Sequence, residues 1–439
     1  MSSIFKSYDI RGIYPTEINE AIVEKIGKAF VTFLKAKKVV VGHDMRSHSK
    51  GLFDALTRGM NYAGADVINI GLCSTPMTYF ANGTLKADGS IMITASHNTA
   101  EWNGLKPCRA NVIPISGKTG IKDIENIVKE ESWYDAPIKG KVIDYDISPE
   151  YGAHIRKFSK LNRKLKVVAD FANSMGSFEI KGIRELFDLI PMYEELDGNF
   201  PNHEANPLVT ETLDDLCKKV RETGADFGAA FDGDADRCGF VDSDGNIIPM
   251  DLFTALIAED VLKDGKQTIL YDLRSSRAVK ECIEANGGNA IMCRVGHAFI
   301  KAQMRDTGAV FAGELSGHYY FKENFTAESQ ALAFLKFANL ICQSGKSSAQ
   351  LVAPLRKYFA SGEINSEVHD PKGVMQMLRL KHLDGKILEL DGLSVEYNDW
   401  WFNARTSNTE PLLRLNVEAD TKEKMIAKRD YLLNLIRSF

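Results

Sequence analysis

Three stretches of this chain share one pattern, in which a short apolar run ends at an aspartate, a polar turn follows and a helical period begins. Asp44, Asp170 and Asp272 mark the three copies. An apolar run bounded by turn residues predicts a buried strand, and apolar residues spaced by three and four predict an amphipathic helix. Strands that alternate with helices form mostly parallel, doubly wound sheets. The pattern therefore predicts three diverged copies of one βαβ-rich unit.

The last part of the chain has a different pattern. Residues 393–397 and 412–417 alternate between apolar and polar side chains, and residues 422–437 have the period of an amphipathic helix. The predicted fold class is therefore α/β, with three similar doubly wound-like domains and a smaller C-terminal α+β domain. We place the domain boundaries so that the four domains cover residues 1–148, 149–249, 250–362 and 363–439.

Composition and charge exclude several classes of function. The 439 residues are 44% hydrophobic and 26% charged, as in an ordinary soluble globular protein. A net charge of −5 argues against nucleic-acid partners, and the lack of an apolar run of about 18 residues argues against a membrane span. The first residues lack the apolar core of a signal peptide, and the seven cysteines form no C-x-x-C pair. We therefore expect a cytoplasmic protein.

Asp232, Asp234 and Asp236 stand at alternate positions directly after the apolar run 227–231. The carboxyl ends of such strands are where α/β proteins build their sites. Three carboxylates this close repel one another by about 1 to 4 kcal/mol per pair, and a bound divalent cation removes that repulsion. Ligation by carboxylates alone favours Mg²⁺ over softer metals. The alternative is an acidic surface loop that binds no metal.

Ser96 follows the apolar run 91–93 in a turn of small and polar residues. Such a turn exposes a hydroxyl group and presents backbone N–H groups to an anion. A turn at Gly104 would bring Lys106 back towards this serine. The alternatives are a turn that only ends a strand and a lysine that is only solvated.

Two further polar loops suit a sugar phosphate. Residues 313–318 combine glycines with one carboxylate, one hydroxyl and one imidazole, which together can hold sugar hydroxyls. Residues 405–409 offer an arginine and several side-chain donors to a phosphate. The alternatives are a glycine turn with a capping glutamate and a polar hairpin loop. His297 also lies on a glycine turn, where a lone histidine is more often structural than catalytic.

These stretches fit one chemistry when they are taken together. A serine oxygen carries a phosphoryl group, a metal ion and arginine neutralise its charge, a second phosphate binds in the last domain, and a sugar lies between. Phosphoryl transfer asks mostly for positioning and electrostatic stabilisation. Phosphate monoesters also resist uncatalysed hydrolysis, so a phosphoserine can wait for its substrate.

With these motifs placed, the chain resembles the α-D-phosphohexomutase family over essentially its whole length. Residues 94–98 resemble the family's phosphoserine loop, 232–237 its metal loop, 313–318 its sugar-recognition loop and 405–409 its phosphate loop. The resemblance implies four domains around a central cleft, three of them alike and the last one smaller.

The resemblance also implies roles for single residues. The implied metal ligands are a phosphate oxygen on Ser96 and the carboxylates of Asp232, Asp234 and Asp236. The implied catalytic residues are Ser96, Lys106, His318, Arg237, Arg11 and His97. Among them, Lys106 and His318 are the candidates for general base and general acid. The implied substrate-binding residues are Arg274, His297, Glu314, Ser316, His318, Arg405, Ser407, Asn408 and Thr409.

Within the family, the segments 296–301, 361–366 and 402–418 are most similar to bacterial phosphomannomutases. That similarity implies reversible conversion of mannose 6-phosphate and mannose 1-phosphate through phospho-Ser96 and a 1,6-bisphosphate intermediate. It also implies Mg²⁺ as cofactor, a hexose 1,6-bisphosphate as activator and GDP-mannose biosynthesis as the usual setting. Two alternatives stay open, namely the same enzyme acting on glucose or glucosamine phosphates and a non-catalytic sugar-phosphate sensor. We expect a monomer or a homodimer.

Overall fold

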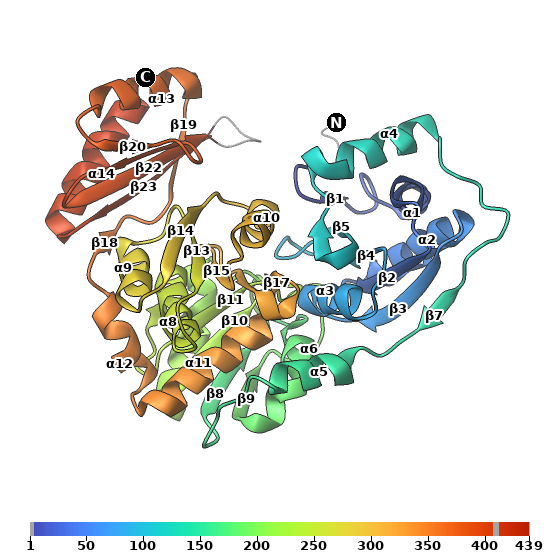
Figure 1. Ribbon diagram of the computed structural model, residues 1–439, viewed down its shortest axis with the longest axis horizontal. Coiled ribbons are helices and arrows are strands. Elements are labelled where there is room, and N and C mark those ends of the chain that lie inside the picture. Colours follow the sequence, from blue (N-terminus) through green and yellow to red (C-terminus); the bar gives the residue numbers. More distant parts are fainter. Residues whose placement is uncertain (1–3, 407–411, 439) are drawn as a thin grey trace.

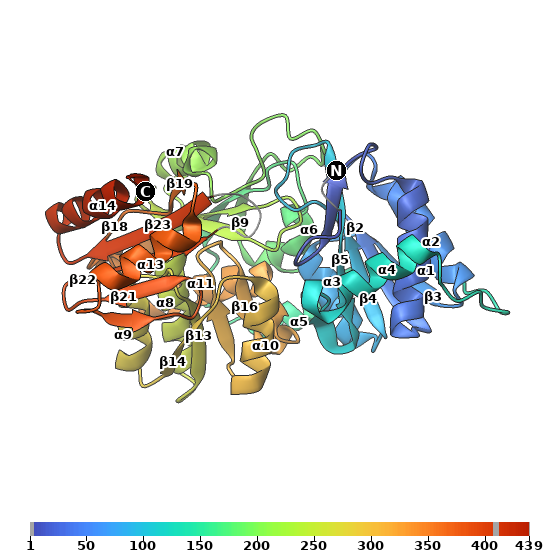
Figure 2. The same ribbon diagram turned by 90° about the horizontal axis from the view of Figure 1, so that it is seen from above.

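The computed structural model describes residues 4–406 and 412–438, which form four β-sheets and their helices (Figure 1). The first sheet (blue) and the fourth sheet (red) lie at opposite ends of the long axis, with the second and third sheets between them (Figures 1 and 2). The first three sheets are mixed and the fourth is antiparallel.

The first sheet has the strand order β1-β5-β4-β2-β3-β7, with β6 paired to β5. Its strands are β1 (Ile10–Ile13), β2 (Lys38–His43), β3 (Asp66–Leu72), β4 (Gly89–Ile93), β5 (Trp102–Arg109), β6 (Ile113–Pro114) and β7 (Val142–Asp144). Its helices are α1 (Glu20–Leu34), α2 (Ser49–Tyr62), α3 (Thr75–Thr84) and α4 (Lys122–Glu130).

The second sheet has the order β12-β11-β10-β8-β9, and the third has the order β14-β13-β15-β16-β17. The second is built from β8 (Lys166–Asp170), β9 (Asp188–Met192), β10 (Phe227–Phe231), β11 (Cys238–Val241) and β12 (Ile247–Ile248), with α5 (Ser148–Arg156), α6 (Gly176–Glu179) and α7 (Asp214–Thr223). The third is built from β13 (Thr268–Asp272), β14 (Asn289–Cys293), β15 (Phe311–Gly313), β16 (Tyr319–Phe321) and β17 (Ala327–Glu328), with α8 (Met250–Leu262), α9 (Arg277–Ala285), α10 (His297–Thr307), α11 (Gln330–Ser344) and α12 (Ser348–Val352).

The same strand arrangement occurs in the first three sheets. In each, the strand before the repeated aspartate lies at the centre of a parallel trio: β2 between β4 and β3, β8 between β10 and β9, and β13 between β15 and β14. An antiparallel strand then extends each trio, namely β5, β11 and β16. The prediction of three diverged α/β units is therefore confirmed.

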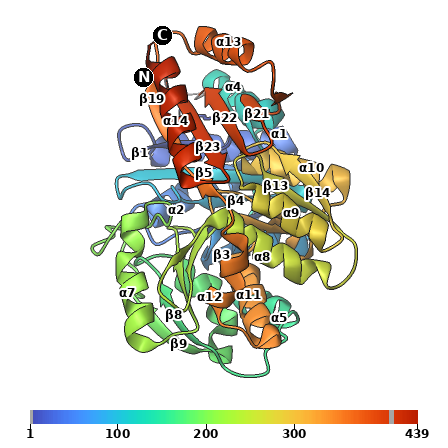
Figure 3. The same cartoon turned by 90° about the vertical axis from the view of Figure 1, so that its left-hand side faces the viewer.

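The fourth sheet is antiparallel and is covered by its own helices, which confirms the predicted C-terminal α+β domain. Its strands are β18 (Phe359–Ala360), β19 (Ile364–Glu367), β20 (Lys386–Leu388), β21 (Leu393–Glu396), β22 (Trp400–Thr406) and β23 (Leu412–Ala419), and its helices are α13 (Pro371–Lys381) and α14 (Lys422–Arg437). Because β18 pairs with β23, this sheet begins before residue 363, where the sequence placed the start of the last domain. In Figure 3, α13 and α14 lie at the top of the molecule and β8 and β9 at the bottom.

Helices begin and end where the sequence provides the required groups. Asn19, Ser74 and Ser329 each accept a hydrogen bond from a backbone N–H in the first turn of α1, α3 and α11. Such caps satisfy donors that have no partner inside the helix. Gly224 ends α7 with a φ of 60°, a left-handed conformation that glycine adopts without strain.

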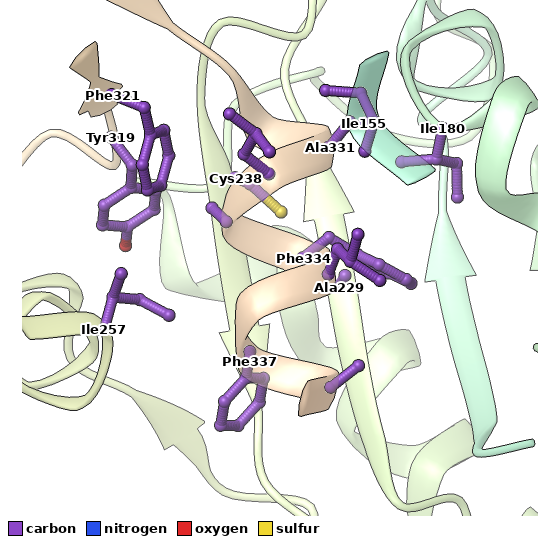
Figure 4. Close-up of a cluster of buried hydrophobic side chains, with 14 of the residues drawn as sticks. Ile155, Ile180, Ala229, Cys238, Ile257, Tyr319, Phe321, Ala331, Phe334 and Phe337 are labelled. Atoms are coloured by element: carbon purple, nitrogen blue, oxygen red, sulfur yellow. The ribbon is translucent and has the colours of Figure 1, made fainter. Parts of the chain in front are cut away.

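The second and third sheets share one apolar core, which is built around α8 and α11 (Figure 4). Helix α11 is buried from Gln330 to Cys342. Phe240 of β11 stacks on Phe253 of α8 with ring centroids 3.8 Å apart, and the ring of Phe337 lies edge-on to both. The fourth sheet has a separate core with its own helices. Among the described helices, none is long and apolar enough to cross a membrane.

We predict that Phe253→Ala lowers the free energy of unfolding by about 3–5 kcal/mol, because it removes a buried ring from the shared core and leaves a cavity. Urea unfolding followed by circular dichroism measures the change. Tyr134→Ala is the control, since that side chain is 52% exposed; its change should stay within about 0.5 kcal/mol. Equal stability of the two variants would contradict the shared core.

Candidate active site

Ser96 lies in the turn that follows β4 and is 1% exposed. Its φ is 53°, a left-handed conformation that is strained for a residue with a side chain and is common at functional sites. The backbone N–H of Ser96 donates to the Thr94 hydroxyl at 2.9 Å. The Ser96 hydroxyl donates to Asp232 Oδ2 at 2.8 Å, although Asp232 belongs to the next sheet. The predicted phosphoserine loop and metal loop therefore meet.

Gly233 permits this meeting. A Cβ atom at position 233 would lie 2.1 Å from the backbone oxygen of Ser96, well inside van der Waals contact. A side chain at this position would push the two loops apart, so the backbone approach requires glycine.

Asp232, Asp234 and Asp236 are all buried, and they offer one ligand atom each within 4.8 Å of one another. The Asp234 Oδ1 atom is buried and accepts no hydrogen bond from the described residues. A buried acceptor of this kind needs a partner. A cluster of carboxylate oxygens suits a hard divalent cation such as Mg²⁺, so these residues fit the metal that the sequence implied.

Lys106 of β5 supplies positive charge to the same cluster. Its Nζ donates to Asp234 Oδ2 at 2.6 Å and to Asp236 Oδ2 at 2.5 Å. Burial disfavours the charged lysine, but the carboxylates of Asp234 and Asp236 outweigh that effect and raise the pKa of Lys106. Burial and the neighbouring Asp234 raise the pKa of Asp232 above its usual value. In this geometry Lys106 keeps its proton.

His318 lies between two carboxylates. Its Nε2 is 3.3 Å from Asp236 Oδ1, and its Nδ1 is 3.2 Å from Glu314 Oε2 and 2.7 Å from the Ser316 hydroxyl. Burial opposes protonation, but Asp236 and Glu314 raise the pKa of His318 to about 9. The sugar-recognition loop and the metal loop therefore share one charged imidazole.

A row of ion pairs continues into the fourth sheet. Arg274 binds Asp272 through its Nε at 3.0 Å, and its Nη2 lies 3.9 Å from Glu314. Arg274 Nη1 also lies 3.4 Å from Glu363, which in turn accepts from Arg405 Nη2 at 2.8 Å. Contacts therefore connect the phosphoserine loop to Arg405 across all four sheets. Ser407, Asn408 and Thr409 of the predicted phosphate loop lie outside the described residues.

The remaining predicted residues are found around this row. Arg11 donates to Asn98 Oδ1 at 2.5 Å beside the phosphoserine loop, and the backbone N–H of Arg237 donates to Asp232 Oδ1 at 3.1 Å. The Nδ1 atom of His97 is 3.3 Å from Ser96 Oγ; burial and nearby Arg237 lower the pKa of His97 to about 2. The ring of His297 lies edge-on to Tyr8, and burial and Lys301 hold its pKa well below the usual value. Both of these imidazoles are therefore neutral.

Arg46 is a residue that sequence reasoning missed. It is 2% exposed, and its guanidinium donates to the backbone oxygens of Ser96 at 3.0 Å, Asn98 at 2.6 Å and Thr99 at 2.7 Å. Asp44, the repeated aspartate of the first unit, pairs with it at 3.2 Å. The planar guanidinium of Arg46 therefore fixes the backbone of the phosphoserine loop by hydrogen bonds. The only signal in the sequence was its place in the polar turn after the first repeated strand.

We predict that Arg46→Lys lowers the free energy of unfolding by at least about 2 kcal/mol, because lysine offers three donors without the planar fork and leaves buried carbonyls unsatisfied. Chemical denaturation measures this loss, and hydrogen exchange should show faster opening of residues 94–99. Arg163→Lys is the matched control, since Arg163 pairs with Asp226 and its side chain is 52% exposed. A similar loss in both variants would contradict the assignment.

Comparison with known proteins identifies one family over almost the whole chain. Descriptions of the phosphoglucomutase/phosphomannomutase family match in order: alpha/beta/alpha domain I at residues 2–135, domain II at 149–245, domain III at 249–358 and the C-terminal domain at 363–432. Relatives named phosphomannomutase from Methanocaldococcus jannaschii and Escherichia coli are 40% and 39% identical. These alignments cover 99% of this chain, and 97% and 99% of the respective relative.

Solved structures agree with these sequence matches. A phosphoglucomutase/phosphomannomutase family protein from Burkholderia thailandensis superimposes with a TM-score of 0.92 at 32% identity, over 99% of this chain and 97% of that one. The open form of parafusin, a phosphoglucomutase from Paramecium, shares the fold with a TM-score of 0.79 at 16% identity, over 98% and 94% of the two chains. The chain belongs to the phosphoglucomutase/phosphomannomutase family, which confirms the family predicted from its motifs.

Proposed function

We propose that this chain is an isomerase that interconverts mannose 6-phosphate and mannose 1-phosphate by phosphoryl transfer through Ser96. The observation that carries the proposal is the 2.8 Å contact between the Ser96 hydroxyl and Asp232, inside a cluster of three buried carboxylates. A serine that only ended a strand would have no need of this cluster. The names of the relatives, at about 40% identity over the full chain, support mannose phosphates as substrates.

The three carboxylates and a phosphate oxygen on Ser96 would hold Mg²⁺. When bound, the ion supplies positive charge to the phosphoryl group and lowers the repulsion among the aspartates. Arg11 donates to Asn98 of the phosphoserine loop, and Arg237 Nε lies 3.9 Å from Asp232 Oδ2, so both would add positive charge near Ser96. Preorganised charge of this kind is the main contribution a protein makes to phosphoryl transfer.

The reaction consists of two transfers in opposite directions. In the first, the free sugar hydroxyl attacks the phosphorus on Ser96, the bond between phosphorus and Ser96 Oγ breaks, and the hydroxyl proton passes overall to the serine oxygen. The 1,6-bisphosphate then turns in the site, and its other phosphate returns to Ser96. Lys106 and His318 both carry a proton in this geometry, which favours them as proton donors and as positive charges.

The sugar and its second phosphate would occupy the row of side chains between the metal loop and the fourth sheet. Glu314 and Ser316 would accept and donate hydrogen bonds to sugar hydroxyls, with His297 beside them. Arg274 and Arg405 would bind the phosphate together with residues 407–409. Both arginines now share Glu363, so an entering phosphate competes with that carboxylate.

The nearest alternative is the same reaction on glucose or glucosamine phosphates, because these sugars differ from mannose only at C2. A non-catalytic sensor is disfavoured, because every group that the transfer requires is present. A hexose 1,6-bisphosphate would activate the enzyme by loading Ser96. A cytoplasmic location agrees with seven cysteines that are all unpaired.

We predict that Ser96→Ala abolishes turnover and leaves the fold intact, because no oxygen remains to carry the phosphoryl group. A coupled assay with Mg²⁺ and a hexose 1,6-bisphosphate measures turnover, and circular dichroism serves as the folding control. Intact mass should show one phosphate on the parent chain after treatment with bisphosphate and none on the variant. Near-normal activity of the variant would exclude this mechanism.

We predict that mannose 1-phosphate gives the highest kcat/KM among the 1-phosphates of mannose, glucose and glucosamine. All three are measured under one set of conditions with Mg²⁺ and a bisphosphate activator. A clear preference for glucosamine 1-phosphate or glucose 1-phosphate would replace the mannose assignment and would leave the phosphoserine mechanism in place.

A further inference from the structure

Glu179, at the end of α6, lies where three parts of the chain meet. It is 1% exposed, and its carboxylate accepts hydrogen bonds from Ser74 Oγ at 2.6 Å, the Tyr151 hydroxyl at 2.7 Å and the Ala331 backbone N–H at 2.8 Å. Ser74 precedes α3 of the first sheet, Tyr151 lies in α5, and Ala331 lies in α11 of the third sheet's layer. One carboxylate therefore joins elements from three different sheets.

Two of these contacts are made at the N-termini of helices. Ser74 caps α3 by accepting the Met77 N–H, and Ser329 caps α11 by accepting the Leu332 N–H. The Tyr151 hydroxyl, which donates to Glu179, also lies 2.9 Å from Ser329 Oγ. The N-terminus of a helix carries partial positive charge, so an ionised carboxylate between two of them is stabilised by both.

The residues next to these caps hold the metal loop. The Thr75 backbone N–H donates to the backbone oxygen of Asp234 at 2.9 Å, and the Thr75 hydroxyl donates to the side-chain carboxylate of Asp234. On the other side, Gln330 Nε2 donates to the Asp236 backbone oxygen at 2.6 Å. The elements that Glu179 joins are therefore the same elements that fix two of the three predicted metal ligands.

We propose that Glu179 is a positioning residue for the metal loop, which it sets by holding the N-termini of α3 and α11 together. The inference rests on the proposed function, because that function assigns Mg²⁺ to Asp232, Asp234 and Asp236. Glu179 acts through Thr75 and Gln330 and takes no part in the chemistry itself.

The cost of this arrangement supports the inference. A buried carboxylate loses its hydration and is tolerated only when its oxygens are hydrogen-bonded. Burial raises the pKa of Glu179 to about 7, and the donors from Ser74, Ala331 and Tyr151 act in the opposite direction. An apolar side chain would fill this space without that cost, but it would not connect the two helices.

The test is Mg²⁺ binding to the full chain carrying phospho-Ser96, measured by calorimetry and by the rise of the melting temperature with Mg²⁺. We expect Glu179→Gln to weaken Mg²⁺ binding about tenfold, since loss of outer groups that orient metal ligands has effects of this size. The matched control is Asp251→Asn. Asp251 is also buried near a helix start, and it accepts the N–H groups of Ser276 and Leu252 in the third sheet's layer. This control should lose stability but keep the parent's Mg²⁺ affinity.

A double-mutant cycle separates positioning from general loosening. Thr75→Val removes the hydroxyl that touches Asp234 and keeps the shape of the side chain. If Glu179 acts through Thr75, the double variant binds Mg²⁺ more tightly than the sum of the two single losses predicts. Fully additive losses, or parent-like Mg²⁺ affinity in Glu179→Gln, overturn the inference.

If Glu179→Gln does not fold, Ser74→Ala replaces it, with Ser347→Ala as its control because Ser347 caps α12 in the same way. Only Ser74→Ala should weaken Mg²⁺ binding, and equal affinities in the two variants overturn the inference. A parent chain that neither binds Mg²⁺ nor turns over sugar phosphate overturns the proposed function and this inference together. A parent that does both, with an unchanged Glu179→Gln, overturns the inference alone.

Discussion

The contact between the Ser96 hydroxyl and the Asp232 carboxylate is the constraint on which the rest of the structure depends. It brings the turn after β4 against the turn after β10, across the border between two sheets. The backbones come so close that only glycine fits at position 233. One apolar core contains Met92 of β4 and Phe231 of β10, so buried side chains pack the two sheets together beside this contact.

Charge is the second constraint, because Asp232, Asp234 and Asp236 are buried and offer ligand atoms within 4.8 Å of one another. Lys106 pairs with Asp234 and Asp236, and Arg237 lies 3.9 Å from Asp232. His318 connects Asp236 to Glu314. From there, acids and bases alternate through Arg274, Glu363 and Arg405 towards the fourth sheet. Each charge in this row has a partner of opposite sign, which is the condition under which buried charges are tolerated. In the proposed function, the phosphates of the substrate would replace a carboxylate in this row.

Much of the fold was predictable because it follows from local patterns. Apolar runs followed by Asp44, Asp170 and Asp272 predicted the central strands of three sheets, and the alternating pattern near residue 395 predicted the antiparallel fourth sheet. The groups of the site were predictable for a related reason, since each lies in a short motif whose chemistry is visible in the residue types. Arg46, Thr75 and Glu179 were not predictable, because each is an ordinary polar residue until its partners are known. Each has a partner far away along the chain: Ser96 is 50 positions from Arg46, Ala331 is 152 from Glu179 and Asp234 is 159 from Thr75.

The sequence by itself determined the secondary structure, the repeated architecture, the family and the chemical types of the groups at the site. These depend on side chains that are close together along the chain, so a single strand or turn carries the information. Only the tertiary structure decided which groups are charged and which residues hold the loops in place. The proton on His318 depends on Asp236 and Glu314 approaching it from two directions, and the position of the metal loop depends on helices that come from different sheets. Both effects arise from burial and proximity, which exist only after the chain has folded.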